Sequence, residues 1–103
     1  MFSVIYITAG DREEARKIGR TLVEEGLAAC ANIFPITSIY RWGGSIEEGS
    51  EFGIFLKTRK SKIKEITERV KQIHSYEVPC VISLNIDEGS EDYVKWIEGS
   101  VQE

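Results

Sequence analysis

The stretch that decides the fold is residues 28–59, AACANIFPITSIYRWGGSIEEGSEFGIFLKTR. Apolar, β-branched and aromatic residues crowd its first part, from Ala28 to Trp42, and a second apolar run follows from Glu51 to Thr58. Between the two runs lies a polar, glycine-rich segment, residues 43–49, which is typical of a turn. The pattern therefore predicts an unusually long β-hairpin.

The first arm of this hairpin is too long for the rest of the chain to cover. At a rise of ~3.3 Å per residue it reaches on the order of 50 Å, whereas a helix of about 13 residues spans only ~20 Å. An uncovered strand that carries Ile36, Ile39, Tyr40 and Trp42 would be an aggregation edge in a monomer. We therefore expect a partner subunit to cover it.

Pro35 interrupts this arm and has no N–H group to donate to a strand ladder. A bend or bulge is predicted there, with the outer half, residues 36–42, reaching another chain. The alternative is a shorter strand, a loop at Pro35 and a second short strand, all within one subunit.

Length and composition indicate one soluble globular domain, residues 1–103. The chain is 42% hydrophobic and 29% charged, with a formal net charge of -4. An acidic chain without a basic stripe is a poor general binder of nucleic acid. No signal-peptide pattern is visible and the apolar run Val4–Ile7 is too short to span a bilayer, so no membrane partner is expected. A cytoplasmic location follows as the default.

The rest of the chain predicts alternating strands and helices. Met1–Ala9 is a near-continuous apolar run, typical of a central strand buried on both sides. Helical spacing follows, with Asp11 as its cap and Gly26 at its end. A strand, a helix and a strand in this order imply parallel pairing of the first two strands.

The second half continues the alternation. Ser61 can cap a second helix whose opposite, charged face includes Lys62 and is expected to be solvated. A strand from Cys80 to Ile86 follows, and a last helix starts at Gly89-Ser90, with Tyr93, Trp96 or Ile97, and Val101 facing inward. The order is β-α-β-β-α-β with a short C-terminal helix, an α+β ferredoxin-like sandwich.

No catalytic constellation is visible, which argues against an enzyme. The single histidine, His74, closes the second helix, where the helix dipole favours it for structural reasons alone. The functional alternative makes His74 a metal ligand together with the thiolate of Cys30, a pair that suits copper or zinc. For Cys30 and Cys80 the structural alternative is two buried, reduced thiols. Any metal site should be open, weak or shared between chains, and no cofactor is obligatory.

A second group combines aromatic and charged residues in strand and loop positions. Convergent polar groups among aromatic rings are typical of small-ligand clefts. The alternative is that the strand aromatics anchor a subunit contact and the two charged strand residues form an ion pair. The candidate ligand-binding residues are Tyr40, Trp42, Glu51, Lys57, Tyr76 and Glu77.

Almost end to end, the chain resembles the CutA family, the divalent-cation tolerance proteins. The residues that carry the resemblance are Ile7-Thr8-Ala9, Gly26 to Ile33, Ser38 to Trp42, Gly44, Ile46, Leu56-Lys57-Thr58, His74 to Pro79, and Asp92, Tyr93, Trp96 and Ile97. The resemblance implies a homotrimer with the long hairpins packed between subunits, similar in architecture to the PII signalling proteins. It also implies a role in tolerance of copper and other divalent metals.

The resemblance places Cys30 and His74 at the family's thiol and imidazole positions, and the six candidate ligand residues in a cleft between subunits. Some bacterial members have a cysteine where this chain has Ile7 and a second histidine where it has Ile73, so weaker metal binding is expected here. The rival function is a PII-like trimer that takes a small anion or metabolite in the cleft. Lys57, the cation in an otherwise acidic cleft, favours that rival.

Overall fold

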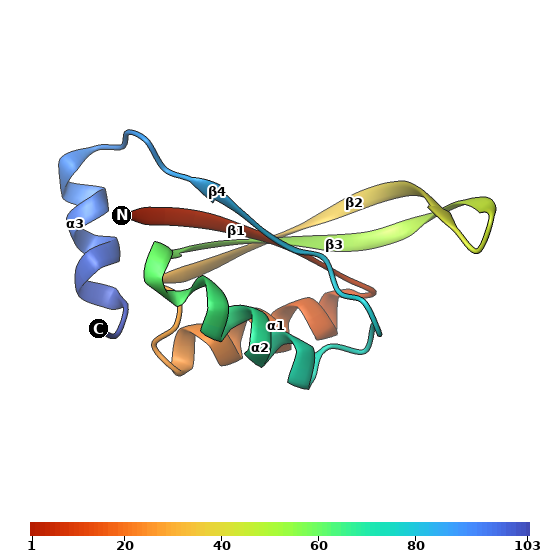
Figure 1. Ribbon diagram of the computed structural model, residues 1–103, viewed down its shortest axis with the longest axis horizontal. Helices are drawn as coiled ribbons and strands as arrows, with labels where there is room; N and C mark the ends of the chain where they lie inside the picture. Colours follow the sequence, from red (N-terminus) through yellow and green to blue (C-terminus); the bar gives the residue numbers. More distant parts are fainter.

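The computed structural model describes all 103 residues. Strands and helices follow in the order β1 (Phe2–Ala9), α1 (Arg12–Glu24), β2 (Cys30–Trp42), β3 (Ser45–Arg59), α2 (Ile63–Ile73), β4 (Val81–Asn85) and α3 (Glu91–Ser100). The predicted α+β order of elements is confirmed (Figure 1). No helix is both long and apolar enough to cross a membrane.

The four strands form one sheet in the order β2-β3-β1-β4, with every neighbouring pair antiparallel. The predicted parallel pairing of the first two strands is wrong, because β3 lies between them. The tight turn after β2 folds β3 back along it, and the other edge of β3 then pairs with β1.

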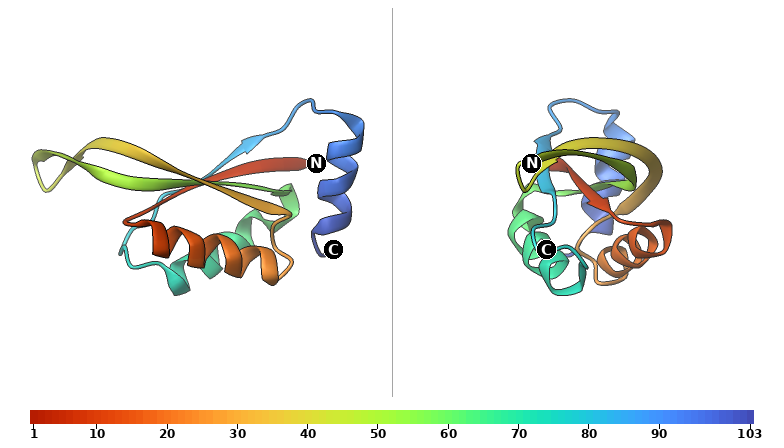
Figure 2. Two further views of the ribbon diagram at one scale, coloured as in Figure 1. Left: turned by 180° about the vertical axis from the view of Figure 1, so that it is seen from behind. Right: turned by 90° about the vertical axis from the view of Figure 1, so that its right-hand side faces the viewer.

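Helices α1 and α2 lie side by side on one face of this sheet (Figures 1 and 2). Residues of β1 are alternately buried and half-buried, so within the chain the predicted burial holds for the helix side only. Only alternate residues such as Ile5 and Ile7 reach the helices, because successive side chains of a strand point to opposite faces. The core is a cluster of buried residues on the helix side, namely Ile5, Ile7, Ala9, Ala15, Ile18, Leu22, Leu27, Ala28, Ile54, Leu56, Ile66 and Val70.

Local signals explain most helix boundaries. The side chain of Asp11 accepts a hydrogen bond from the backbone N–H of Glu14 at 2.8 Å, so the predicted cap is confirmed. Ser61 does not cap α2: it lies in a 3₁₀ turn, Lys60–Lys62, and Lys62 is buried rather than solvated. At Gly19 a Cβ atom would lie 2.9 Å from the Cβ of Ala31, so a glycine lets α1 approach β2 closely.

The hairpin of β2 and β3 pairs without interruption from Cys30 and Lys57 to Trp42 and Ser45. No bulge occurs at Pro35, which faces Phe52 in register; β2 is an edge strand, where a missing N–H is tolerated. The predicted bulge and the alternative of two short strands are therefore both wrong.

The turn of the hairpin is tighter than the predicted segment 43–49. It consists of Gly43 and Gly44 alone, with φ angles of 58° and 84°. Two consecutive residues with positive φ match the twist of antiparallel strands, and glycine adopts them without strain. The second arm consequently begins at Ser45, six residues before the predicted Glu51.

Beyond the sheet the hairpin continues alone, because β1 ends at Ala9, opposite Phe52. Its outer part projects from the body, which gives the chain extents of 44 × 26 × 21 Å (Figure 1). Ile39 and Trp42 are 67% and 63% exposed there. The chain therefore leaves a long apolar strand pair uncovered.

The second sheet face carries no helix (Figure 2). Its apolar side chains include an aromatic cluster of Tyr6, Phe34 and Phe55, with ring centroids 4.9 to 6.4 Å apart. Next to them on β4, Ile82 and Leu84 are more than half exposed.

Helix α3 packs across one end of the sheet instead (Figure 1). Its contact is a small cluster of three buried side chains, Ala29, Ile97 and Val101. Tyr93 and Trp96, predicted to face inward, are about half exposed. Of the two alternatives Trp96 and Ile97, Ile97 is therefore the residue that faces the interior, and Val101 is buried as predicted.

Candidate functional site

A hollow of about 660 Å³ lies between the outer part of the hairpin and the loop that follows α2. Five of the six predicted ligand residues line it: Tyr40, Trp42, Glu51, Tyr76 and Glu77. The remaining lining residues are Thr8, Thr37, Ser38, Ile39, Val78 and Cys80. Five of the residues that the sequence analysis grouped together thus lie around one hollow, among eleven lining residues.

Strand pairing brings the hairpin residues to one side. Ile36 faces Glu51 across the ladder, and residues paired in this way point to the same face. Because every second residue of a strand shares a face, Tyr40 and Trp42 lie on the side of Glu51. The other wall, Tyr76 and its neighbours, comes from the loop after α2.

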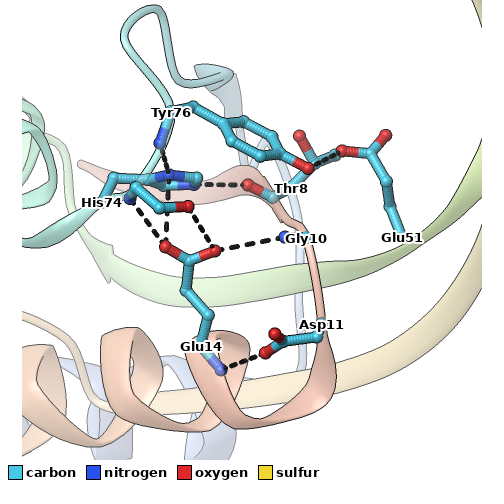
Figure 3. A network of polar contacts seen from close by, with 8 residues as sticks. Thr8, Gly10, Asp11, Glu14, Glu51, His74 and Tyr76 are labelled. Atoms are coloured by element: carbon cyan, nitrogen blue, oxygen red, sulfur yellow. Dashed lines mark hydrogen bonds and ion pairs between the residues drawn. The ribbon is translucent and has the colours of Figure 1, made fainter.

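The His74 ring fixes this loop to the sheet (Figure 3). Its side chain is fully buried, and its Nε2 lies 2.7 Å from the carbonyl oxygen of Thr8. Its Nδ1 accepts a hydrogen bond of 3.0 Å from the backbone N–H of Tyr76. Because the carbonyl only accepts and the amide only donates, the ring carries its proton on Nε2. Both ring nitrogens therefore have protein partners.

Glu14 on α1 holds the same loop from the helix side (Figure 3). Its carboxylate accepts hydrogen bonds from the backbone N–H of Ser75 at 2.7 Å, the Ser75 hydroxyl at 2.9 Å and the N–H of Gly10 at 3.3 Å. Burial raises the pKa of this carboxyl, but the hydrogen bonds from Ser75 and Gly10 outweigh it and the pKa is lowered. The charged carboxylate of Glu14 therefore holds the loop that carries Tyr76 by hydrogen bonds.

Replacing Glu14 with glutamine should make the protein less sensitive to acid. Since the folded-state pKa lies below the ordinary 4.5, the carboxylate stabilises the fold above that pH and loses its effect as the pH falls through the lowered pKa. We expect Glu14→Gln to lose about 1 to 2 kcal/mol at pH 7 and to converge with the wild type in acid.

Urea unfolding between pH 3 and pH 7 measures this difference. The matched control is Glu13→Gln, which removes an exposed carboxylate from the neighbouring position. If the difference in the free energy of unfolding between Glu14→Gln and the wild type is the same at every pH from 3 to 7, the charge of Glu14 contributes nothing to stability.

Tyr76 and Glu51 meet inside the hollow. The Tyr76 hydroxyl donates to the Glu51 carboxylate, with 2.6 Å between the oxygens. Burial and this hydrogen bond raise the pKa of Tyr76, so its phenol stays protonated. The pKa of the Cys80 thiol is also raised, by burial and then by the charge of Glu51. The hollow therefore contains neutral hydroxyl and thiol groups around a carboxylate.

Lys57, the sixth predicted ligand residue, is not in this hollow. It lies nearer the other end of β3, opposite Cys30, and its ammonium contacts the side-chain oxygen of Asn32. Along β3 it is six residues from Glu51, a distance of ~20 Å. The predicted ion pair between the two residues is absent, and no lysine or arginine lines the hollow that one chain forms.

The two predicted metal ligands are far apart within the chain. Cys30 lies near the level of Val4, whereas His74 contacts Thr8, four residues or ~13 Å further along β1. The half-buried Sγ of Cys30 lies 3.7 Å from the Tyr93 hydroxyl. No cluster of three or more His, Cys, Asp or Glu side chains in the chain could hold a metal ion. One chain alone therefore cannot form the predicted Cys30–His74 site.

Sequence reasoning missed two parts of the site. It placed Cys80 in a strand, but this residue lies just before β4 and lines the hollow. It also missed the role of Glu14. The spacing of Glu14 from Asp11 signals the cap, but nothing in the sequence signals its contact with Ser75, 61 residues away.

Comparison with known proteins then decides the family. Residues 3–100 match the family model described as CutA1 divalent ion tolerance protein. The chain belongs to this family. Its resemblance to CutA proteins, inferred from the sequence, is thereby confirmed.

Known relatives and solved structures agree with this family assignment. The divalent-cation tolerance protein CutA of Archaeoglobus fulgidus is 44% identical over 102 residues, which is 99% of this chain and 100% of the relative. Human CutA is 42% identical over 92% of this chain, which corresponds to 54% of the human protein. Among structures, the periplasmic divalent cation tolerance protein CutA from A. fulgidus superposes with a TM-score of 0.97, at 44% identity, covering 99% of this chain and 100% of that one. The CutA1 structure from Thermus thermophilus gives a TM-score of 0.96, at 43% identity, over 99% and 100% of the two chains.

Proposed function

We propose that this CutA-family protein acts in divalent-metal tolerance as a homotrimer that binds copper weakly. The observation that carries the proposal is the projecting hairpin, whose Ile39, Trp42 and Ile46 are 59% to 67% exposed. Contiguous apolar surface of this kind marks a protein contact, and symmetric copies of one chain are the commonest way to cover it.

The open sheet face supports the same assembly. Phe55, Ile82 and Leu84 are 38% to 55% exposed on a face that no helix covers. The hairpin and this face together offer each copy two apolar surfaces. The number three follows from the family resemblance, whereas the need for sister copies follows from the exposed surface.

For copper we propose Cys30 as the ligand that the chain provides. Its thiol is half-buried beside the exposed edge of the sheet, and thiolate sulfur is a preferred ligand of Cu(I). His74 is a poor second ligand, because both of its ring nitrogens are engaged in the interior. The remaining ligands would come from water or a second chain, which makes binding weak.

Copper titration tests this part of the proposal. Wild type, Cys30→Ser and the matched control Cys80→Ser are titrated anaerobically with Cu(I) against a competing chelator. We expect Cys30→Ser to lower the affinity about tenfold or more and Cys80→Ser to leave it unchanged. Identical isotherms for wild type and Cys30→Ser would contradict the assignment. Tight binding that disappears in His74→Ala, while the fold persists, would restore His74 as the ligand.

A further inference from the structure

The Glu51 carboxylate lies in the hollow without a cation beside it. It is half-buried, and none of the ion pairs in the structure includes it. Its only side-chain hydrogen bond comes from the Tyr76 hydroxyl. A partly buried charge is costly unless it is paired, and this one has no partner within the chain.

The charge of Glu51 affects the groups around it. It contributes to the raised pKa values of Tyr6, Tyr76 and Cys80, in each case after burial as the larger cause. These groups therefore stay neutral near pH 7 and add no further negative charge. No Lys, Arg or His lines the hollow. Within one chain, the site is thus negatively charged and lacks a cation.

The remaining walls are aromatic and apolar. Tyr40, Trp42 and Tyr76 bring three rings to the lining, together with the aliphatic Ile39 and Val78. Aromatic faces attract cations, most strongly when the cation also loses water. A volume of about 660 Å³ is in the range of small-molecule sites.

We infer that this hollow binds an organic ammonium ion, with Glu51 as the counter-charge and the rings of Tyr40 and Trp42 as its apolar walls. The Tyr76 hydroxyl holds one oxygen of Glu51 at 2.6 Å and leaves the other to accept from an ammonium N–H. The inference is separate from the proposed copper binding, which involves Cys30 and none of these residues. It does share Ile39 and Trp42 with the proposed trimer contact, and therefore requires that the sister copy which covers the hairpin leaves the hollow open.

Two other classes of ligand fit less well. An anion would meet the charges of Glu51 and Glu77 with no lysine or arginine to offset them. A divalent metal ion requires several ligands, and no cluster of three or more His, Cys, Asp or Glu side chains is present. An ammonium ion needs only one carboxylate and the aromatic faces.

Three probes of similar shape distinguish these classes. Isothermal titration calorimetry of the full chain, in its native assembly, compares phenethylammonium with neutral 2-phenylethanol and anionic 3-phenylpropionate. We expect saturable binding of phenethylammonium, at least about tenfold tighter than that of either other probe. Equal binding of the cation and the alcohol, or no saturable binding at millimolar concentration, would overturn the inference.

A matched pair of variants tests the role of Glu51. Glu51→Gln keeps an oxygen that accepts from Tyr76 but removes the charge, and should weaken phenethylammonium about tenfold or more without changing 2-phenylethanol. Glu48→Gln removes an exposed carboxylate of the same strand that does not line the hollow, and should change neither. Unchanged binding in Glu51→Gln would overturn the inference.

The assembly is followed in the same samples. The mass of each variant, measured by light scattering, reports the proposed trimer independently of the probe. A crystal structure in which a side chain of a second copy fills the hollow would also overturn the inference, while leaving the trimer intact.

Discussion

Shortening the hairpin should give a folded protein with the mass of a single chain. The change replaces residues 39–48 with Asn-Gly, so that Ser38 connects to Gly49 through a two-residue turn. In an antiparallel ladder, directly opposed pairs alternate between two hydrogen-bonding types. The pair Ser38–Gly49 is of the same type as the pair Trp42–Ser45, because it lies four residues further along each strand, so it can also flank a two-residue turn. None of the removed residues belongs to the buried core, so the body should keep its fold.

Light scattering and far-UV circular dichroism measure this outcome. A control that replaces only Gly43-Gly44 with Asn-Gly retains the full arms and should keep the mass of the wild type. If the shortened protein still assembles like the wild type, the hairpin does not hold the subunits together.

Replacing His74 with alanine should strongly destabilise the protein. The buried ring bonds to the Thr8 carbonyl and the Tyr76 N–H, and alanine would leave both groups unpaired beside a cavity. We expect a loss of about 3 to 5 kcal/mol in the free energy of unfolding.

Urea unfolding at one fixed protein concentration measures this loss, because assembly makes stability depend on concentration. Gln72→Ala, an exposed position near the same helix end, serves as the control and should change stability little. A loss below about 1 kcal/mol for His74→Ala would show that its two hydrogen bonds do not hold the loop.

Single local signals predicted several elements of the fold, although the local signals at Ser61 and Pro35 misled. Asp11 and Gly26 delimit α1 as expected, and the apolar run after Ala28 became the long first arm. Strand neighbours could not be read in the same way, because the position of β3 between β1 and β2 depends on packing across the whole sheet. Residues 45–49 were predicted to belong to the turn, yet the two-residue turn at Gly43-Gly44 and the pairing with the opposite arm made them part of a strand.

The candidate site was also predicted only in part, because some of its contacts follow from local patterns and others depend on packing between distant segments. Tyr40 and Trp42 share a face because of strand periodicity, which a sequence reveals, whereas Glu51 joins them through the register of the two arms. Lys57 seemed to belong with them, but residues six apart on a strand lie ~20 Å from each other. The sequence marked His74 as important, while its burial between Thr8 and the Tyr76 backbone depends on contacts that no local pattern reveals.

The mass of the wild-type assembly in solution tests the central claim most directly. The claim is that sister copies cover a hairpin which its own chain leaves exposed. Multi-angle light scattering on a size-exclusion column, over a range of protein concentrations, should give three times the 11.7 kDa of one chain throughout. A mass of 11.7 kDa with the hairpin intact and soluble would contradict the account.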